Sequence, residues 1–550
     1  MDFWDGLWLN EGFATWMSWY SCNVFYPEWK VWESYVTDNL QSALSLDSLR
    51  SSHPIEVPVK RAEEVNQIFD AISYSKGSCV LRMISTYIGE DTFMEGVRQY
   101  LKKHAYGNTQ TGDLWAALGA ASGKPVEKVM DIWTKNVGYP VISVTENKDN
   151  TISVKQNRFL RTGDVKPEED KILYPVFLGI RTADGIDESL VLSDREGTFN
   201  VPDFYKLNAD HTSIYRTSYS PERLEKLGEA AKQGLLSVQD RAGMVADAGA
   251  LASSGYQKTS GLLNLVKGFT DESEFVVWNE LLSRLAVIKS AWIFEPEAVQ
   301  DGLTAFQKEL VSEKAHKAGW TFTEGEDHLQ QQFKTLLFGS AGLSGDAKVI
   351  AAAQDMFSKF AAGDKSAIHP NIRGSVFSIV LKNGGSKEYD VILDSYRNSK
   401  NSDERNTALR SLGRAKDPEL IKRTLALPLG GEVKEQDIYL PVSALRTHAD
   451  GVTALYDWMK ENWDELQRKL PAGLSMLGSM VTICTSSFTS EAQRADVESF
   501  FKSKNTKGFE MPLAQSLESI QAKGAWVERD RDDVQKWVKE NGYGRVKSEL

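Results

Sequence analysis

Cysteine is scarce in this sequence. The chain of 550 residues contains three cysteines, Cys22, Cys79 and Cys484, and they lie far apart. An odd and widely spaced set of cysteines does not build a disulfide framework. Proteins of reducing compartments keep their cysteines unpaired, so we expect a cytoplasmic protein.

Long apolar runs and an excess of positive charge are also missing. No run reaches the roughly 18 consecutive apolar residues that indicate a membrane-spanning helix, so we expect no membrane span. The 64 Lys and Arg residues are outnumbered by 76 Asp and Glu residues, which gives a net charge of -12. This surplus of negative charge argues against nucleic acid or an anionic membrane as the main partner. It favours basic ligands and the free N-termini of peptides.

The chain is too long to fold around a single hydrophobic core. Single cores stop growing at roughly 250 to 300 residues, so we expect two or three domains. Hydrophobic residues make up 41% of the chain and charged residues 25%, a composition typical of globular proteins. The chain opens in an aromatic-rich helical pattern with no polar tail before it, whereas true N-termini are usually solvated. We therefore expect the sequence to begin partway through a longer protein.

The spacing of apolar residues predicts a mainly α-helical protein with a small β region. Residues 1–139 show the period of about 3.6 that is typical of helices. Residues 140–219 show a period of two with turn residues in between, which predicts a small antiparallel β-sandwich. Residues 220–550 return to the helical period without a fixed repeat, which predicts an irregular α-solenoid of the HEAT or armadillo kind. The expected strands are 141–144, 151–154, 174–181 and 189–192.

Glu11 is the first residue whose position requires an explanation. Helical spacing places it on one face with Leu7, Trp8 and Ala14, and we expect that face to be buried. Burying a carboxylate without a partner costs on the order of several kcal/mol. Two interpretations follow from spacing alone: an internal salt bridge or raised pKa, and ligation of a metal ion.

Tyr74 is the second such residue. It lies in the segment 73–77 (SYSKG), where a phenol precedes a Lys-Gly pair at a predicted helix start. A phenol can donate a hydrogen bond to an oxyanion without carrying charge itself. The alternative is a core tyrosine whose hydroxyl reaches water, and the residue alone does not decide between the two.

Several segments together resemble the M1 aminopeptidases, a family of zinc peptidases of the gluzincin type. Residues 4–14 (WDGLWLNEGFA) resemble the second zinc-binding segment of the family, and residues 73–77 resemble its catalytic tyrosine motif. Residues 136–141 (NVGYPV) resemble its junction into the β-sandwich. Residues 239–241 and 369–373 resemble landmarks of its helical C-terminal domain. The resemblance runs along essentially the whole chain and is greatest to the cytosolic fungal and animal branch.

This resemblance implies an activity, a cofactor and a site. It implies an aminopeptidase that binds Zn²⁺ and releases N-terminal residues from peptides with a free N-terminus. By resemblance, Glu11 is the third protein ligand to zinc, and Tyr74 donates a hydrogen bond to the tetrahedral intermediate. The implied fold is a partial thermolysin-like helical half-domain over 1–139, followed by the β-sandwich and the helical C-terminal domain.

The family's His-Glu-x-x-His motif is missing from the chain. The seven histidines lie at 53, 104, 211, 316, 328, 369 and 448, and no two are four residues apart. Without this motif the chain lacks two of the family's zinc ligands and the general base that activates the zinc-bound water. The family's Gly-Ala-Met-Glu-Asn segment, which binds the substrate's amino group, is missing too. We therefore expect the C-terminal portion of such an enzyme, without the N-terminal β domain and the metal helix, and inactive as given.

Two other hypotheses stay open at this point. One is a non-catalytic helical module that holds peptides or a protein partner on a concave face. The other is a half-enzyme that a separate chain completes by supplying the metal helix.

Overall fold

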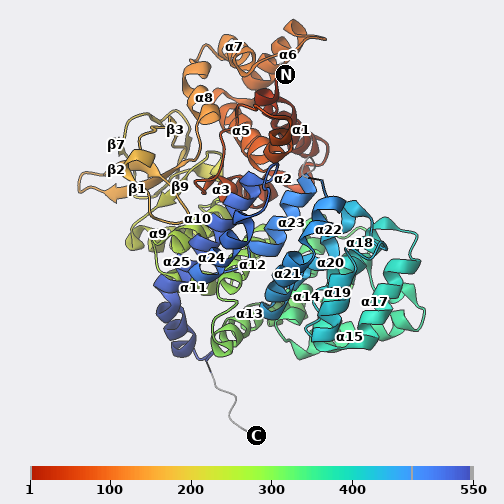
Figure 1. The fold of residues 1–550 in the computed structure, drawn as a ribbon. Coiled ribbons are helices and arrows are strands. Elements are labelled where there is room, and N and C mark those ends of the chain that lie inside the picture. The colour runs from red at the N-terminus through yellow and green to blue at the C-terminus, as the bar shows by residue number, and fades with distance from the viewer. Residues whose placement is uncertain (1–2, 472–474, 545–550) are drawn as a thin grey trace. The chain divides into compact units, whose positions relative to one another are not determined.

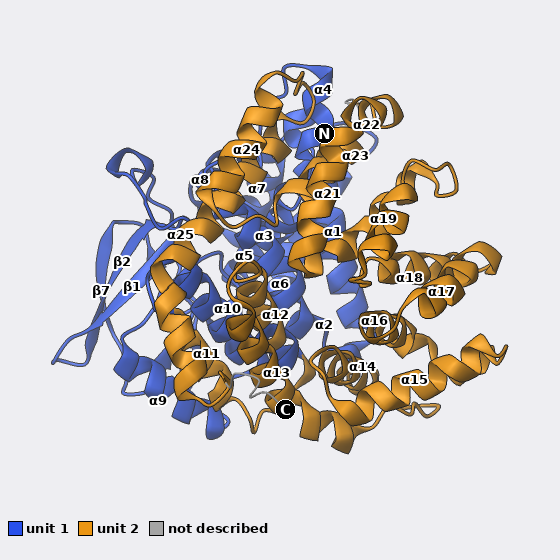
Figure 2. Cartoon of the chain, turned by 60° about the horizontal axis from the view of Figure 1, so that its bottom comes forward, with its two compact units in different colours: residues 1–258, 276–281 blue, residues 259–275, 282–550 orange. Residues whose placement is uncertain are grey.

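The structure is a computed structural model that describes residues 3–471 and 475–544. The chain forms two compact units, which Figure 2 shows in different colours. Unit 1 comprises residues 1–258 and 276–281, and unit 2 comprises residues 259–275 and 282–550. The expectation of a mainly helical protein with a small β region is confirmed (Figure 1).

In unit 1, α-helices both precede and follow the strands. A π-helical turn, Val36–Leu40, joins α2 to α3, and a second one, Ile72–Lys76, leads into α5. Ser220 caps α9 by accepting the N–H of Arg223, and Pro221 occupies the first helical position, where no amide hydrogen is required. The α-helices are α1 (Trp8–Phe25), α2 (Val31–Tyr35), α3 (Gln41–Asp47), α4 (Ala62–Val65), α5 (Gly77–Ile88), α6 (Glu90–Lys103), α7 (Thr111–Ser122), α8 (Val126–Lys135), α9 (Pro221–Lys232) and α10 (Val238–Ser254).

The strands of unit 1 form three small sheets. The largest has the order β7-β2-β1-β9, in which β1 is antiparallel to β2 and parallel to β9. The other two have the orders β3-β6 and β5-β4-β8. The strands are β1 (Pro140–Glu146), β2 (Thr151–Arg158), β3 (Val176–Phe177), β4 (Ile180–Thr182), β5 (Gly185–Asp187), β6 (Val191–Leu192), β7 (Glu196–Asn200), β8 (Tyr205–Lys206) and β9 (Arg216–Ser218).

The strand expected over 174–181 is interrupted in the structure. It divides into β3, which pairs with β6, and β4, which pairs with β5 and β8. Gly179 lies between them with a φ of 53°, a left-handed conformation that favours glycine. The alternation of apolar residues indicated an extended chain correctly, but it could not indicate that the chain passes from one sheet to another at this glycine.

One hydrophobic core joins the helices of unit 1 to its strands. The ring of Trp133 on α8 lies 4.5 Å from that of Tyr174, and the ring of Tyr87 on α5 lies 4.5 Å from that of Phe177 on β3. The indole N–H of Trp133 also donates to the carbonyl oxygen of Pro175 at 3.2 Å. The segment around β3 therefore packs against α8 and against α5, the helix that begins at Gly77.

Unit 2 is helical. Within the described residues, no single helix is both long enough and apolar enough to cross a membrane, and one bent pair, α14 with α15, meets that criterion jointly. The helices are α11 (Thr259–Gly268), α12 (Phe275–Ala291), α13 (Glu297–Ala318), α14 (His328–Leu343), α15 (Ala347–Ala361), α16 (Arg373–Asn383), α17 (Ser386–Asn398), α18 (Ser402–Leu412), α19 (Pro418–Ala426), α20 (Tyr439–Ser443), α21 (Ala449–Glu461), α22 (Trp463–Lys469), α23 (Ser475–Thr485), α24 (Glu491–Lys502) and α25 (Glu510–Glu540).

Candidate functional site

Glu11 lies on α1, at the edge of the buried stripe of that helix. Trp8, Gly12 and Trp16, spaced four residues apart, are buried. Glu11 adjoins Gly12 and is half-buried. The expectation that Ala14 shares the buried face is wrong. An α-helix turns by about 100° per residue, so Ala14 lies about 200° beyond Gly12, and it is exposed.

Tyr74 lies on the π-helical turn Ile72–Lys76 that precedes α5. Short π-helical turns occur frequently at functional sites. The Asp70 side chain fixes the start of this turn, because its Oδ1 atom accepts the backbone N–H of Ile72 at 2.9 Å. Its Oδ2 atom accepts a hydrogen bond from Nε2 of the buried His53 at 2.8 Å. The backbone that carries Tyr74 is therefore anchored by two side chains.

The surroundings of His53 favour its doubly protonated form. Its Nδ1 atom lies 2.7 Å from the carbonyl oxygen of Pro54, and its Nε2 atom lies 2.8 Å from the Asp70 carboxylate. Both partners are acceptors, so both contacts are hydrogen bonds only when both ring nitrogens carry hydrogen. Burial alone would lower the pKa of His53, but the hydrogen bond and charge of Asp70 outweigh burial and raise it. Sequence reasoning missed this pair, since no motif joins two residues 17 positions apart.

Two glycines bring the segments of Glu11 and Tyr74 together. A Cβ atom added at Gly12 would lie 2.9 Å from the carbonyl carbon of Gly77 and 3.1 Å from the backbone oxygen of Ser73. Both distances are shorter than ordinary van der Waals contact, so α1 and the start of α5 pack backbone against backbone. Only glycine at position 12 allows this approach without displacing one of the two segments.

The approach brings the phenol of Tyr74 close enough to the carboxylate of Glu11 for the two groups to interact. Burial raises the pKa of Tyr74, and the hydrogen bond and negative charge of Glu11 raise it further. The phenol is therefore neutral and protonated at physiological pH. The structure thus joins the two residues that the sequence singled out, which lie 63 positions apart (74 minus 11).

A buried ion pair ties the tyrosine segment to the start of the strands. The Nζ atom of Lys76 lies 2.7 Å from Oδ2 of Asp47 and donates to the carbonyl oxygen of Gly138 at 3.1 Å. The N–H of Gly138 donates to Oδ1 of Asp47 at 3.0 Å. Lys76 and Asp47 are 0% and 1% exposed, so neither charge is screened by water. Residues 73–77 and 136–141 therefore meet at Asp47, a residue that no sequence pattern marked.

Asp240 and His369 belong to the two segments that resemble the family's C-terminal domain, and both make hydrogen bonds or ion pairs within the fold. Asp240, buried in unit 1, pairs with Lys206 at 2.8 Å and with Arg181 at 2.5 Å. His369 begins a short 3-10 helix in unit 2, where its ring accepts the N–H of Asn371 at 3.2 Å. The interactions of Asp240 involve neither Glu11 nor Tyr74.

A complete metal site is not found among residues 3–471 and 475–544. No three His, Cys, Asp or Glu side chains converge there in a way that could hold a metal ion. A catalytic zinc ion requires three protein ligands and an open position for water. Glu11 supplies one carboxylate, and its neighbour Tyr74 is a protonated phenol, so the residues of this chain do not fit a whole zinc site.

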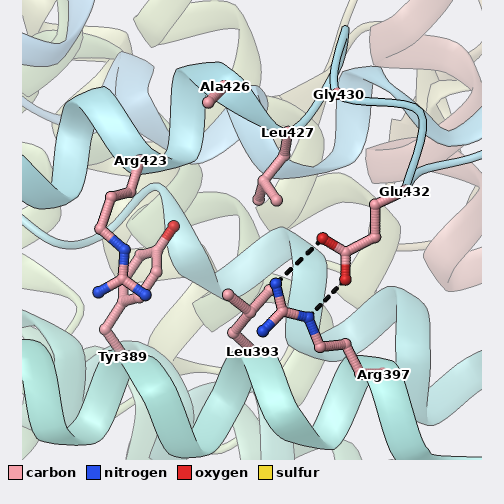
Figure 3. Close-up of a pocket in the computed structure, with 8 residues that line it drawn as sticks. All are labelled: Tyr389, Leu393, Arg397, Arg423, Ala426, Leu427, Gly430 and Glu432. Carbon is pink, nitrogen blue, oxygen red and sulfur yellow. Dashed lines mark hydrogen bonds and ion pairs between the residues drawn. The ribbon is translucent and has the colours of Figure 1, made fainter.

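Unit 2 contains a hollow of about 260 Å³ between α17 and α19 (Figure 3). Its arginines have partners. Nε and Nη2 of Arg397 donate to the two carboxylate oxygens of Glu432 at 2.5 and 3.1 Å. Arg423 pairs with Asp390 at 2.7 Å and lies over the ring of Tyr389. The positive charges beside this hollow are therefore already balanced.

Comparison with known proteins identifies two family models along the chain. The Peptidase family M1 domain matches residues 1–133, and the ERAP1-like C-terminal domain matches residues 204–522. The M1 match includes both Glu11 and Tyr74.

Three curated relatives are similar over 99% of this chain. Aminopeptidase 2 of Candida albicans is 56% identical, with 59% of its own length covered. From Saccharomyces cerevisiae, "Aminopeptidase 2, mitochondrial" is 54% identical with 57% covered, and "Alanine/arginine aminopeptidase" is 50% identical with 63% covered. The chain therefore spans about three fifths of the length of the relatives that it matches.

Proposed function

The chain belongs to the M1 family of peptidases, and on this premise we propose that it is the C-terminal portion of a zinc-dependent aminopeptidase that releases N-terminal residues from peptides. The observation that carries the proposal is the contact between Glu11 and Tyr74 across the Gly12 and Gly77 backbones. A metal ligand and an oxyanion donor must lie side by side to act on one peptide bond. We propose the cytoplasm as its compartment, on the basis of its three unpaired cysteines.

In this proposal Tyr74 is the residue that stabilises the reacting carbonyl oxygen. Its raised pKa keeps the hydroxyl protonated, so it can donate a hydrogen bond where negative charge develops. Asp70 and His53 anchor the turn that carries it, and Lys76 anchors the same turn to Asp47. The donor is thereby held in position before substrate binds.

Glu11 is the proposed zinc ligand of this chain. A zinc ion held by Glu11 together with ligands from outside this sequence would supply the polarisation of the scissile carbonyl and the activation of water. One carboxylate cannot hold the ion against solvent, so two further ligands and the general base must come from outside this sequence. We therefore propose that the 550-residue chain is inactive by itself.

The genomic DNA upstream of the first codon provides the first test. An in-frame sequence for His-Glu-x-x-His would support a longer enzyme, and its absence would favour a chain that acts without hydrolysis or with a second polypeptide.

The second test uses the chain expressed behind that upstream region. Tyr74→Phe removes one hydrogen-bond donor to the transition state, so kcat should fall by roughly 10² to 10³ while KM barely changes. Glu11→Ala should lose the zinc, measured by metal analysis. Tyr106→Phe and Glu28→Ala are matched controls, because both side chains are exposed in unit 1. Normal kcat with Phe at position 74, or full zinc content with Ala at position 11, would show that these roles are wrong.

A further inference from the structure

Four basic side chains gather near the C-terminal ends of successive helices in unit 2. α16 packs against both α14 and α18. Lys382, at the end of α16, donates to the carbonyl oxygen of Leu343, the last residue of α14, at 2.5 Å. Arg414 and Lys416 follow directly after α18, and Lys289 lies in the last turn of α12. We call Lys289, Lys382, Arg414 and Lys416 the basic cluster.

The charges of the basic cluster act on one another. Lys289 and Arg414 are half-buried, whereas Lys382 and Lys416 are exposed. Burial lowers the pKa of Lys289, and the positive charges of the other three members lower it further, to about 8. The cluster is therefore close enough for its members to repel one another.

No carboxylate within the described part of the chain forms an ion pair with the basic cluster. The Nζ atom of Lys289 donates to the amide oxygen of Gln307 at 3.0 Å, and that of Lys382 to a backbone carbonyl. Both acceptors are neutral. The guanidinium of Arg414 keeps its hydrogen-bond donors free, and these are not sealed from solvent.

Helix dipoles balance only part of this charge. The C-terminal end of a helix carries the equivalent of about half a negative charge. The ends of α12, α14, α16 and α18 therefore offset about two of the four positive charges, and the carboxylate of Asp301 acts on Lys382 without forming an ion pair with it. The arginines beside the hollow of Figure 3 differ, since Arg397 and Arg423 each have a carboxylate partner.

We propose that the basic cluster binds an oxyanion, namely a phosphate group or the carboxylate of a small organic acid. A tetrahedral or planar group of oxygens can accept hydrogen bonds from several lysine and arginine donors at once, and such charge-assisted bonds are the strong ones. The site is independent of the peptidase function, because its residues all belong to unit 2 and none is a proposed catalytic residue.

Calorimetric titration of the full chain with inorganic phosphate, at constant ionic strength, tests this site. Lys416→Gln should weaken binding about tenfold, which corresponds to about 1.4 kcal/mol. Lys416 is exposed, so this variant should fold normally. Arg397→Gln is the matched control, because it removes an exposed cation that already pairs with Glu432. Absence of binding of both phosphate and acetate, or equal anion affinity in Lys416→Gln and Arg397→Gln, would overturn the proposal.

The reactivity of Lys289 gives a second measurement. A bound anion favours the charged ammonium, so saturating phosphate should slow acetylation of Lys289 at pH 8, measured by mass spectrometry. An unchanged acetylation rate at saturating phosphate would contradict the proposal. Parallel titration with acetate distinguishes the two sources: binding of both anions indicates a general oxyanion site, and binding of phosphate alone assigns the site to a phosphate group.

Discussion

Replacing Gly12 with alanine perturbs the approach of α1 and α5 directly. The new Cβ atom would lie 2.9 Å from the carbonyl carbon of Gly77 and 3.0 Å from its Cα atom. Ordinary contacts begin at 3.4 Å, so the two backbones must separate by about 0.5 Å (3.4 minus 2.9). The opposing atoms belong to backbone, and no side chain can rotate away to relieve the contact.

Two opposing effects decide the stability of this variant. Alanine within a helix is favoured over glycine by roughly 0.5 to 1 kcal/mol. Overpacking of a tight contact costs about 1 to 3 kcal/mol. The overpacking cost prevails, and we expect a net loss of about 1 kcal/mol in the free energy of unfolding. The separation should also weaken the interaction between Tyr74 and Glu11 and lower the pKa of Tyr74 toward its ordinary value.

Urea unfolding followed by tryptophan fluorescence measures the first effect. Gly228→Ala on α9 is the matched control, since it lies in the same unit and its added Cβ atom would meet nothing within 4 Å. That control should gain roughly 0.5 to 1 kcal/mol. Ultraviolet titration, with the Tyr74→Phe chain subtracted, measures the second effect. If Gly12→Ala were as stable as Gly228→Ala, the backbone contact inferred between α1 and α5 would be refuted.

Two further predictions concern metal binding and pH. The 550-residue chain should bind zinc no more tightly than micromolar and should not hydrolyse aminoacyl reporter substrates, because a catalytic zinc ion needs three protein ligands. Tight zinc binding at one ion per chain, or turnover that is lost with Glu11→Ala, would contradict this prediction. The raised pKa of His53 should stabilise the fold fully below the unfolded value of about 6.5, and this contribution should be lost as pH rises through the higher folded value. Its neighbours Asp70 and Asp47 carry the charges that hold the proton. Urea unfolding as a function of pH should show this loss in the unaltered chain and not in His53→Gln, and identical pH profiles would exclude the role of His53.

The sequence determined which regions are helical and which region contains the strands, but it did not indicate β5, β7, β8 or β9. Apolar residues repeat near 3.6 positions before residue 140 and after residue 219, and every strand of the described chain lies between Pro140 and Ser218. Local spacing is enough for this, because the period of a helix or a strand is set within a few residues. Local spacing did not indicate that the chain passes from one sheet to another at Gly179. The choice of sheet depends on distant strands and leaves no local period.

The sequence also named Glu11 and Tyr74, through residue types and spacing that resemble a known family. Spacing on α1 was less reliable for burial, because it cannot tell which neighbours a helix face will meet. Leu7 and Trp8 are buried as expected, while Ala14 is exposed. The roles proposed for Glu11 and Tyr74 stay predictions until the variants are measured.

Only the tertiary structure decided that these two residues meet. The contact depends on Gly12 and Gly77, whose missing side chains let two backbones approach, and on Asp47, which neutralises Lys76 in a site closed to water. Packing of this kind joins residues that are distant in the chain, so no local period or motif contains it. The sequence by itself thus determined the elements and the chemical groups, and the long-range packing determined which of those groups share a site.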